Sequence, residues 1–174
     1  MQIILDNQKI QTLLDDIVSS IMAELGPNDP VALIGIRSRG AAMAQRLVKL
    51  LADQGFSDVD LGTLDITLYR DDLNQKGLDQ PKIRGTEIDF DIDNHFVILV
   101  DDVLWTGRTI RAALDALIDW GRPRVIRLAV LIDRGGRELP ISADYVGKII
   151  EPPVDKKVRV RLREMDEQDV VGLV

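Results

Sequence analysis

Two neighbouring carboxylates, Asp101 and Asp102, lie between an apolar run and a loop that contains two threonines and a glycine. Residues 97–109 read Val-Ile-Leu-Val-Asp-Asp-Val-Leu-Trp-Thr-Gly-Arg-Thr, and the first four have the apolar character of a strand covered on both faces. Apolar positions at helical spacing follow from Thr109 onward. The sequence therefore predicts a strand, an acidic turn, a Gly/Thr loop and a helix, in that order.

The Gly/Thr loop suits a phosphate group. The N-terminus of a helix offers unpaired backbone N–H groups and a partial positive charge to an anion. The hydroxyls of Thr106 and Thr109 can add donors, and Gly107 lets the backbone approach the ligand closely. The two carboxylates suit ribose hydroxyls instead, because each accepts hydrogen bonds from O–H groups, and a nearby Mg²⁺ would offset their charge. A sugar phosphate satisfies both halves of the stretch.

Residues 97–109 resemble the signature by which type I phosphoribosyltransferases bind 5-phosphoribosyl-1-pyrophosphate (PRPP). Two competing nucleotide motifs, Gly-x-x-x-x-Gly-Lys-Ser/Thr and Gly-x-Gly-x-x-Gly, are absent from the sequence. The resemblance implies that Asp101 and Asp102 hold the ribose hydroxyls and act in catalysis. It also implies a 5-phosphate site formed by Val103, Leu104, Trp105, Thr106, Gly107, Arg108 and Thr109.

A second loop follows another buried strand. Residues 31–36 are apolar, and Arg37, Ser38, Arg39 and Gly40 come directly after them, before a helix expected from Ala41 to about Gln54. Ligands of parallel α/β sheets sit at the carboxyl ends of strands, and arginine binds pyrophosphate through its forked donors. In the family that the chain resembles, this position is the pyrophosphate-binding loop. We therefore expect these four residues to bind pyrophosphate.

A long polar segment lies between the two loops. Residues 62–69 alternate as a strand, whereas residues 70–86 contain two glycines and a proline and show no sustained period. A structureless loop of this length in a small domain is usually functional or disordered. We interpret it as a flexible lid that closes over PRPP, excludes water and brings Arg70, Lys82 or Arg84 to the leaving pyrophosphate.

The rest of the chain predicts one α/β domain over residues 1–174. Asp6 is placed to cap a first helix, and strands are expected at 125–132, 145–150 and, as a soluble edge with one basic face, 158–163. Strands alternate with helices, which favours the type I phosphoribosyltransferase fold: a central, mostly parallel sheet flanked by helices. No apolar run has membrane-spanning length, so we expect a cytoplasmic protein without membrane contact. The absence of cysteine and the lone His95 exclude thiolate chemistry and a histidine cluster for zinc.

Stretches outside the PRPP signature resemble the PyrR family, bacterial proteins that pair uracil phosphoribosyltransferase activity with control of pyrimidine operons. They are residues 64–73, Gly121-Arg122-Pro123 and much of 133–148. The resemblance implies that uracil and PRPP give UMP and pyrophosphate, with Mg²⁺ carried by the diphosphate of PRPP. It also implies that Val146 and Lys148 border the uracil. A homodimer or higher homo-oligomer is expected, although the sequence leaves the oligomeric state open. Catalysis would rest on positioning and electrostatic stabilisation, since no strong base is visible.

The regulatory role is less well supported by the sequence. The net charge is −7, and the first helix carries Asp15, Asp16 and Ser19 where RNA-binding relatives have basic residues. Gly136 also replaces a histidine common in its loop, although Arg137, Arg159, Arg161 and Arg163 could compensate. Three readings stay open: an enzyme that makes UMP or uses another base, a UMP- or PRPP-responsive regulator that binds pyrimidine-operon mRNA, and a regulator that acts through a protein partner.

Overall fold

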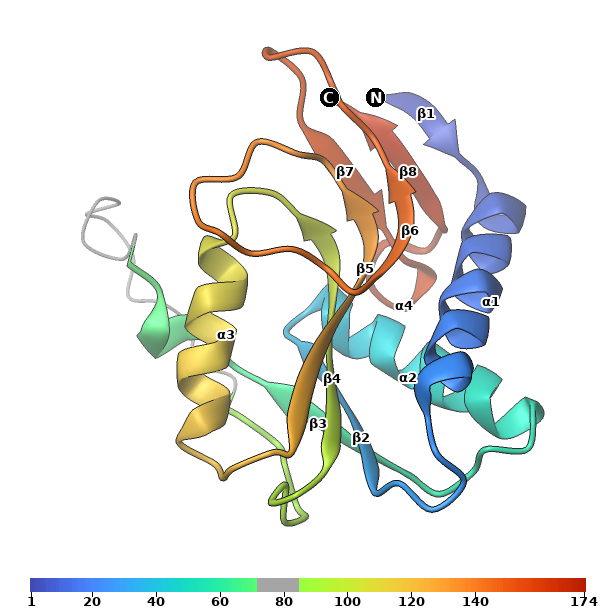
Figure 1. Cartoon of the computed structure of the whole chain (residues 1–174). Coiled ribbons are helices and arrows are strands. Elements are labelled where there is room, and N and C mark those ends of the chain that lie inside the picture. Colours follow the sequence, from blue (N-terminus) through green and yellow to red (C-terminus); the bar gives the residue numbers. More distant parts are fainter. Residues whose placement is uncertain (72–84) are drawn as a thin grey trace.

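A five-stranded parallel sheet forms the centre of the molecule (Figure 1), a computed structural model that describes residues 1–71 and 85–174. Its strand order is β3-β2-β4-β5-β6. The strands are β2 (Val31–Ile36), β3 (Val59–Leu64), β4 (Phe96–Leu104), β5 (Val125–Asp133) and β6 (Tyr145–Ile149). Every neighbouring pair is parallel, which confirms the parallel sheet predicted from the alternation of strands and helices.

Helices cover both faces of this sheet (Figure 1). They are α1 (Asn7–Glu24), α2 (Arg39–Asp53) and α3 (Arg108–Ile118). Successive side chains of a strand point to opposite faces. Accordingly, Val31 and Leu33 pack with α1 and α2, whereas Ala32 and Ile34 pack with α3. The predicted cap of α1 is confirmed, since Asp6 accepts a hydrogen bond from the Lys9 amide at 3.0 Å.

A second, three-stranded antiparallel sheet was not predicted in full. It has the order β1-β8-β7 and joins the two ends of the chain, with β1 at Gln2–Leu5, β7 at Val158–Arg161 and β8 at Val170–Leu173. A four-residue helix, α4 (Arg163–Asp166), connects β7 to β8. β7 lies at the edge of this sheet, as its alternating apolar and basic residues suggest, but it ends at Arg161 rather than at Arg163.

The strand expected at 62–69 is only half correct. β3 begins earlier and ends at Leu64, and a short 3₁₀ helix, η1 (Thr67–Tyr69), follows it. The Asp65 carboxylate breaks the strand by accepting hydrogen bonds from both the backbone N–H and the hydroxyl of Thr67, at 2.9 and 2.5 Å. Leu68, expected on the apolar side of a strand, is exposed.

Three boundaries next to the predicted ligand loops also differ. β4 continues through both acids to Leu104, with Asp101 opposite Val130 of β5, so the acids lie within the last part of a strand rather than in a turn. α2 begins at Arg39 rather than at Ala41, so Arg39 and Gly40 belong to its first turn. The sequence also predicts that the helix after the Gly/Thr loop runs to Trp120, where Gly121-Arg122-Pro123 stops it, whereas α3 ends at Ile118.

The lid prediction mostly concerns residues 72–84, which lie outside the described residues, as do Lys82 and Arg84. In the described part of the chain, no helix combines the length and the apolar character needed to cross a bilayer.

Candidate active site

Two adjacent cavities lie where β2 and β4 end. The first, which we call the β7 cavity, has a volume of about 360 Å³, and the second, the α2 cavity, has a volume of about 350 Å³. The β7 cavity is lined by Arg39, Asp102, Val103, Leu104, Trp105, Thr106, Gly107, Thr109, Ile110, Arg134, Lys157, Val158, Arg159 and Val160. The α2 cavity is lined by Ile36, Arg37, Ser38, Arg39, Asp65, Ile66, Thr67, Arg70, Asp101, Asp102, Val103 and Thr109. Four residues are common to both: Arg39, Asp102, Val103 and Thr109.

The acid pair stands at this junction. Asp101 is buried, and one of its carboxylate oxygens accepts a hydrogen bond from the Asp102 amide at 2.9 Å. Burial raises the pKa of Asp101 well above its ordinary value, and the charge of Asp102 adds to the effect. Burial also raises the pKa of Asp102, although the hydrogen bond with Asp101 and the charge of Arg39 oppose that rise. Burial therefore disfavours the ionised form of both carboxylates, which favours a ligand that brings hydroxyl groups or a cation.

The Gly/Thr loop is held open by the loop that follows β5. Gly107 caps α3 with φ of +92°, a backbone conformation that glycine adopts far more readily than other residues. The carbonyl oxygen of Thr106 accepts hydrogen bonds from the amides of Glu138 and Leu139 at 2.9 and 3.1 Å. Because these bonds fix the turn, the first amides of α3 are presented beside the β7 cavity.

Not every residue of the predicted 5-phosphate site lines a cavity. Arg108 instead forms ion pairs with Asp71 at 2.7 Å and with Glu138 at 2.6 Å, and so braces the start of α3. Trp105 lines the β7 cavity, and the Arg134 guanidinium stacks over its ring at 4.2 Å from the centroid. The aromatic ring and the guanidinium thus form one wall of that cavity.

The predicted pyrophosphate loop is divided in the same way. Arg37, Ser38 and Arg39 line the α2 cavity, and the Arg37–Ser38 peptide is cis. Gly40 does not line it; a Cβ at this position would lie 2.3 Å from the carbonyl oxygen of Val100. Gly40 therefore allows the first turn of α2 to pack directly on β4, which brings the neighbouring arginine beside the acids.

Arg70 lines the α2 cavity as expected, whereas Arg84 lies outside the described residues. The structure adds Asp65, to which the sequence assigned no role. One of its oxygens accepts a hydrogen bond from the Gly85 amide at 3.0 Å, and its own amide donates to the Thr86 hydroxyl at 3.0 Å. Asp65 therefore fixes the chain where it returns to the cavity wall.

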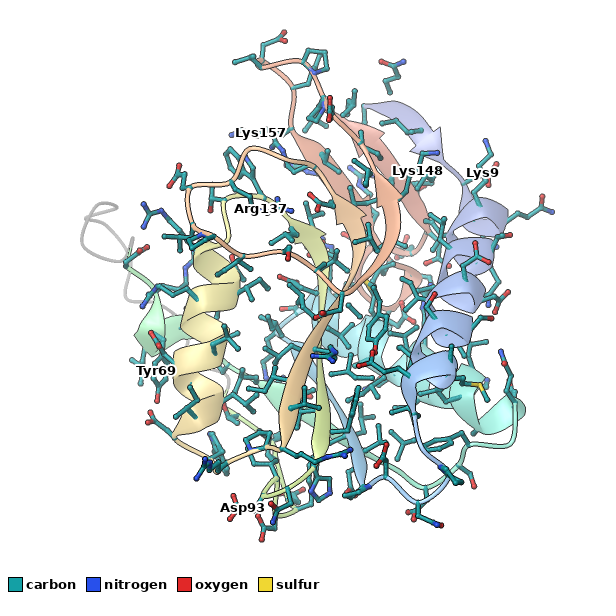
Figure 2. The ribbon with its side chains drawn as sticks, in the orientation of Figure 1. Lys9, Tyr69, Asp93, Arg137, Lys148 and Lys157 are labelled. Carbon is teal, nitrogen blue, oxygen red and sulfur yellow. The ribbon has the colours of Figure 1, made fainter. Side chains whose placement is uncertain are left out.

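The two residues expected to border uracil lie elsewhere. Val146 is half-buried among the side chains on the α3 side of the sheet, and Lys148 is an exposed residue of β6. In Figure 2, Lys148 is seen between β6 and α1, while Lys157 and Arg137 are seen towards α3. Neither Val146 nor Lys148 is among the described residues that line the two cavities.

β7 and the residue before it form another part of the wall of the β7 cavity. Lys157, Val158, Arg159 and Val160 line the β7 cavity, a position that sequence reasoning missed. The only signal was the alternation of apolar and basic residues, which also fits an ordinary solvent-exposed edge strand.

A family model described as the phosphoribosyl transferase domain matches residues 1–167. The chain belongs to this family. Among its relatives are the proteins named Bifunctional protein PyrR of Bacillus cereus strain AH820 and Bacillus mycoides strain KBAB4. Each is 48% identical over 172 residues, covering 98% of this chain and 96% of the relative. The resemblance to the PyrR family is thereby confirmed over nearly the whole length.

Solved structures confirm the fold. The hypoxanthine phosphoribosyltransferase of Trypanosoma cruzi has a TM-score of 0.73 at 20% identity, covering 99% of this chain and 95% of its own. A hypoxanthine-guanine phosphoribosyltransferase of Bacillus anthracis has a TM-score of 0.74 at 17% identity, covering 100% and 98%. The architecture is thus that of the type I phosphoribosyltransferases.

Proposed function

We propose that this chain transfers the phosphoribosyl group of PRPP to uracil, giving UMP and pyrophosphate. The observation that carries the proposal is the position of the acid pair, which stands between a Gly/Thr loop at a helix N-terminus and an arginine-containing loop. Family membership supports the transfer of a phosphoribosyl group, and the 48% identity to PyrR proteins supports uracil as the acceptor.

Three groups of residues bind the three parts of PRPP: the ribose, the 5-phosphate and the diphosphate. Asp101 and Asp102 accept hydrogen bonds from the ribose hydroxyls, because each carboxylate has two acceptor oxygens. The amides and hydroxyls of residues 106–109 receive the 5-phosphate at the start of α3. Arg37, Ser38 and Arg39 bind the diphosphate in the α2 cavity, which Arg70 also lines.

Uracil then enters the β7 cavity rather than approaching Val146 and Lys148. Its acceptor nitrogen must reach the anomeric carbon of a ribose held at Asp102, and this cavity adjoins Asp102 directly. Val103, Val158 and Val160 give it apolar walls for a flat ring, while Arg134 offers donors for a carbonyl oxygen. This placement replaces the expectation drawn from the family resemblance.

The reaction breaks the bond from the anomeric carbon to the diphosphate and forms a bond from that carbon to a uracil nitrogen, which gives up its proton. The protein contributes positioning and electrostatic stabilisation of the separating charges. The described residues contain no group of three or more His, Asp or Glu side chains placed to hold a metal ion. Two carboxylates fit a Mg²⁺ that arrives with the diphosphate, where it would neutralise charge on the leaving group.

A steady-state assay of nucleobases with PRPP and Mg²⁺ tests this function. Pyrophosphate release is expected with uracil and not with hypoxanthine or guanine. Release only with a purine base would move the chain to the purine class. Binding of PRPP without turnover of any base would instead favour a regulator that acts through a protein partner.

The relatives are named bifunctional, and the resemblance to the PyrR family implies a second candidate function, control of pyrimidine operons through mRNA. The surface of α1 opposes it, because Asp16 and Ser19 are exposed and Glu24 is paired with Arg127 at 2.6 Å. Arg137 is likewise engaged with the carbonyl oxygens of Trp105 and Ile141. We therefore rank RNA binding below the enzymatic function.

Gel shifts with pyrimidine-operon leader RNA in the presence of UMP measure this second function. Of the four arginines that the sequence offers for phosphates, Arg137 is engaged and Arg163 pairs with Asp169 at 3.0 Å. Arg159 and Arg161 of β7 are left from that set, so we expect weak binding. Two phosphate contacts correspond to a salt slope of about −1.4 in a double-logarithmic plot of affinity against salt for a single strand. No shift at low salt would exclude RNA binding, whereas a steep slope would show that further basic residues take part.

A further inference from the structure

α4 holds two arginines that lie on one face of α2. Arg39 and Arg46 are two helical turns apart, so their side chains leave the helix on the same side. Arg46 donates to Glu164 at 2.7 and 2.6 Å and to Asp169 at 2.7 Å. Arg39 donates from Nη2 to both oxygens of Asp166 at 3.0 Å. The short segment between β7 and β8 therefore anchors the first half of α2 at two points.

The two arginines differ in what they face. Arg46 lines neither the β7 cavity nor the α2 cavity, whereas Arg39 lines both. The Nε of Arg39 is buried without a hydrogen-bond partner among the described residues. A buried donor without a partner is costly, so it favours an acceptor supplied by a ligand.

We propose that Asp166 is a positioning residue for phosphoribosyl transfer, which holds the Arg39 guanidinium at the junction of the two cavities so that its free Nε donates to an oxygen of the bound diphosphate. This inference rests on the proposed function, because it names a determinant of the same site. Asp166 itself lines neither cavity and acts through Arg39.

Asp166 is itself held firmly. Its Oδ2 accepts a hydrogen bond from the Leu162 amide at 3.0 Å, and its own amide donates to the Leu162 carbonyl oxygen at 2.7 Å. Burial raises the pKa of Asp166, but the Leu162 amide and Arg39 outweigh that effect and lower it overall. The carboxylate therefore stays ionised at neutral pH and keeps its hold on the guanidinium.

The contacts of Asp166 also connect a wall of the β7 cavity to the arginine that lines both cavities. Leu162 is fully buried and directly follows β7, whose residues 158–160 line the β7 cavity. Asp166 is fixed to Leu162 on one side and to Arg39 on the other. A base against β7 and a diphosphate against Arg39 would thus be held in register by one rigid connection.

Asp166→Asn is the variant that tests the proposal, with Glu164→Gln as its control. Asparagine keeps an oxygen for the Leu162 amide but loses the charge that holds Arg39. Glu164→Gln removes a charge from the same helix and from Arg46, which touches neither cavity. The readouts are the Kd of PRPP with Mg²⁺ by calorimetry, and KM and kcat with uracil, across pH.

In Asp166→Asn we expect the Kd and KM for PRPP to rise about tenfold, with a smaller change in kcat. The acidic limb of the pH profile of kcat/KM, where activity falls at low pH, should also move to higher pH. The charge of Arg39 lowers the pKa of Asp102, and in the variant Arg39 would no longer be fixed beside that carboxylate. If Arg39 stayed in place, loss of the Asp166 charge would strengthen its effect on Asp102 and move the limb to lower pH. Glu164→Gln should leave the affinity and the limb unchanged.

An unchanged Kd in Asp166→Asn, a limb that moves to lower pH, or an equal loss in Glu164→Gln would overturn the proposal. If Asp166→Asn fails to fold, Asp166→Glu keeps the charge but displaces the carboxylate, and the same loss of affinity is expected. Wild-type protein that binds PRPP but does not turn over uracil would refute the proposed reaction alone, since calorimetry still compares the variants. Wild-type protein that binds no PRPP would refute both.

Discussion

Asp102→Asn is expected to lower kcat/KM for PRPP between a hundredfold and a thousandfold, roughly the loss seen when one preorganised group that stabilises a transition state is removed. Asp102 lines both cavities, so it lies beside the ribose whichever partner occupies each cavity. An amide presents one acceptor and two donors, and it also removes the negative charge that would stabilise a positively charged ribose ring. Steady-state kinetics of pyrophosphate release measure the loss.

The pH dependence gives the same variant a second, independent readout. In the wild type, burial and the neighbouring charge raise the pKa of Asp101, so activity that needs the ionised pair falls as the pH drops through this raised value. Asp102→Asn removes the neighbouring charge, and the pKa of Asp101 should fall. The acidic limb of the residual kcat/KM is therefore expected to move to lower pH, opposite to the shift predicted for Asp166→Asn.

Asp89→Asn provides a matched control, because Asp89 is exposed and lies outside both cavities. It makes the same change of charge and should leave kcat/KM and its pH profile unaltered. Wild-type kinetics in Asp102→Asn would remove the acid pair from the mechanism and, with it, the basis of the proposed function.

The elements around the acids could be predicted because their signals are local. β2 and the first part of β4 are continuous apolar runs, as expected for strands that are covered on both faces. Asp6 and Gly107 cap α1 and α3, and each cap involves only the first turn of its helix. Arg37, Arg39 and the acids were expected to meet since the carboxyl ends of parallel strands share one edge of a sheet. The structure brings these residues together around the α2 cavity.

Residues that reach the site from distant parts of the chain could not be predicted. Asp166 contacts Arg39 across 127 positions, and nothing in the sequence near either residue marks the pairing. β7 lines a cavity only because β1 and β8 form a second sheet, whose strands are too short to show a clear period. Gly40 is predicted to bind pyrophosphate, and the structure gives its missing side chain a further role, the close packing of α2 on β4, which the sequence does not indicate.

Gly107→Ala separates the shape of the phosphate loop from the stability of the fold. Gly107 has φ of +92°, and alanine there costs about 1–2 kcal/mol in the left-handed conformation. The chain can relieve that cost only by turning the amides of residues 106–109 away from the cavity. We expect the Kd for PRPP to rise about tenfold, because bound PRPP must restore the strained turn at a cost of about 1–2 kcal/mol.

Gly55→Ala is the matched control, because Gly55 has nearly the same backbone angle, φ of +90°, with no atom within 4 Å of a new Cβ. It lies after α2 and lines neither cavity. Both variants should lose similar free energy of unfolding in urea, about 1 kcal/mol, since both impose the same conformation on alanine. Only Gly107→Ala should lose PRPP, so equal affinities in the two variants would show that the 5-phosphate is bound elsewhere than at the start of α3.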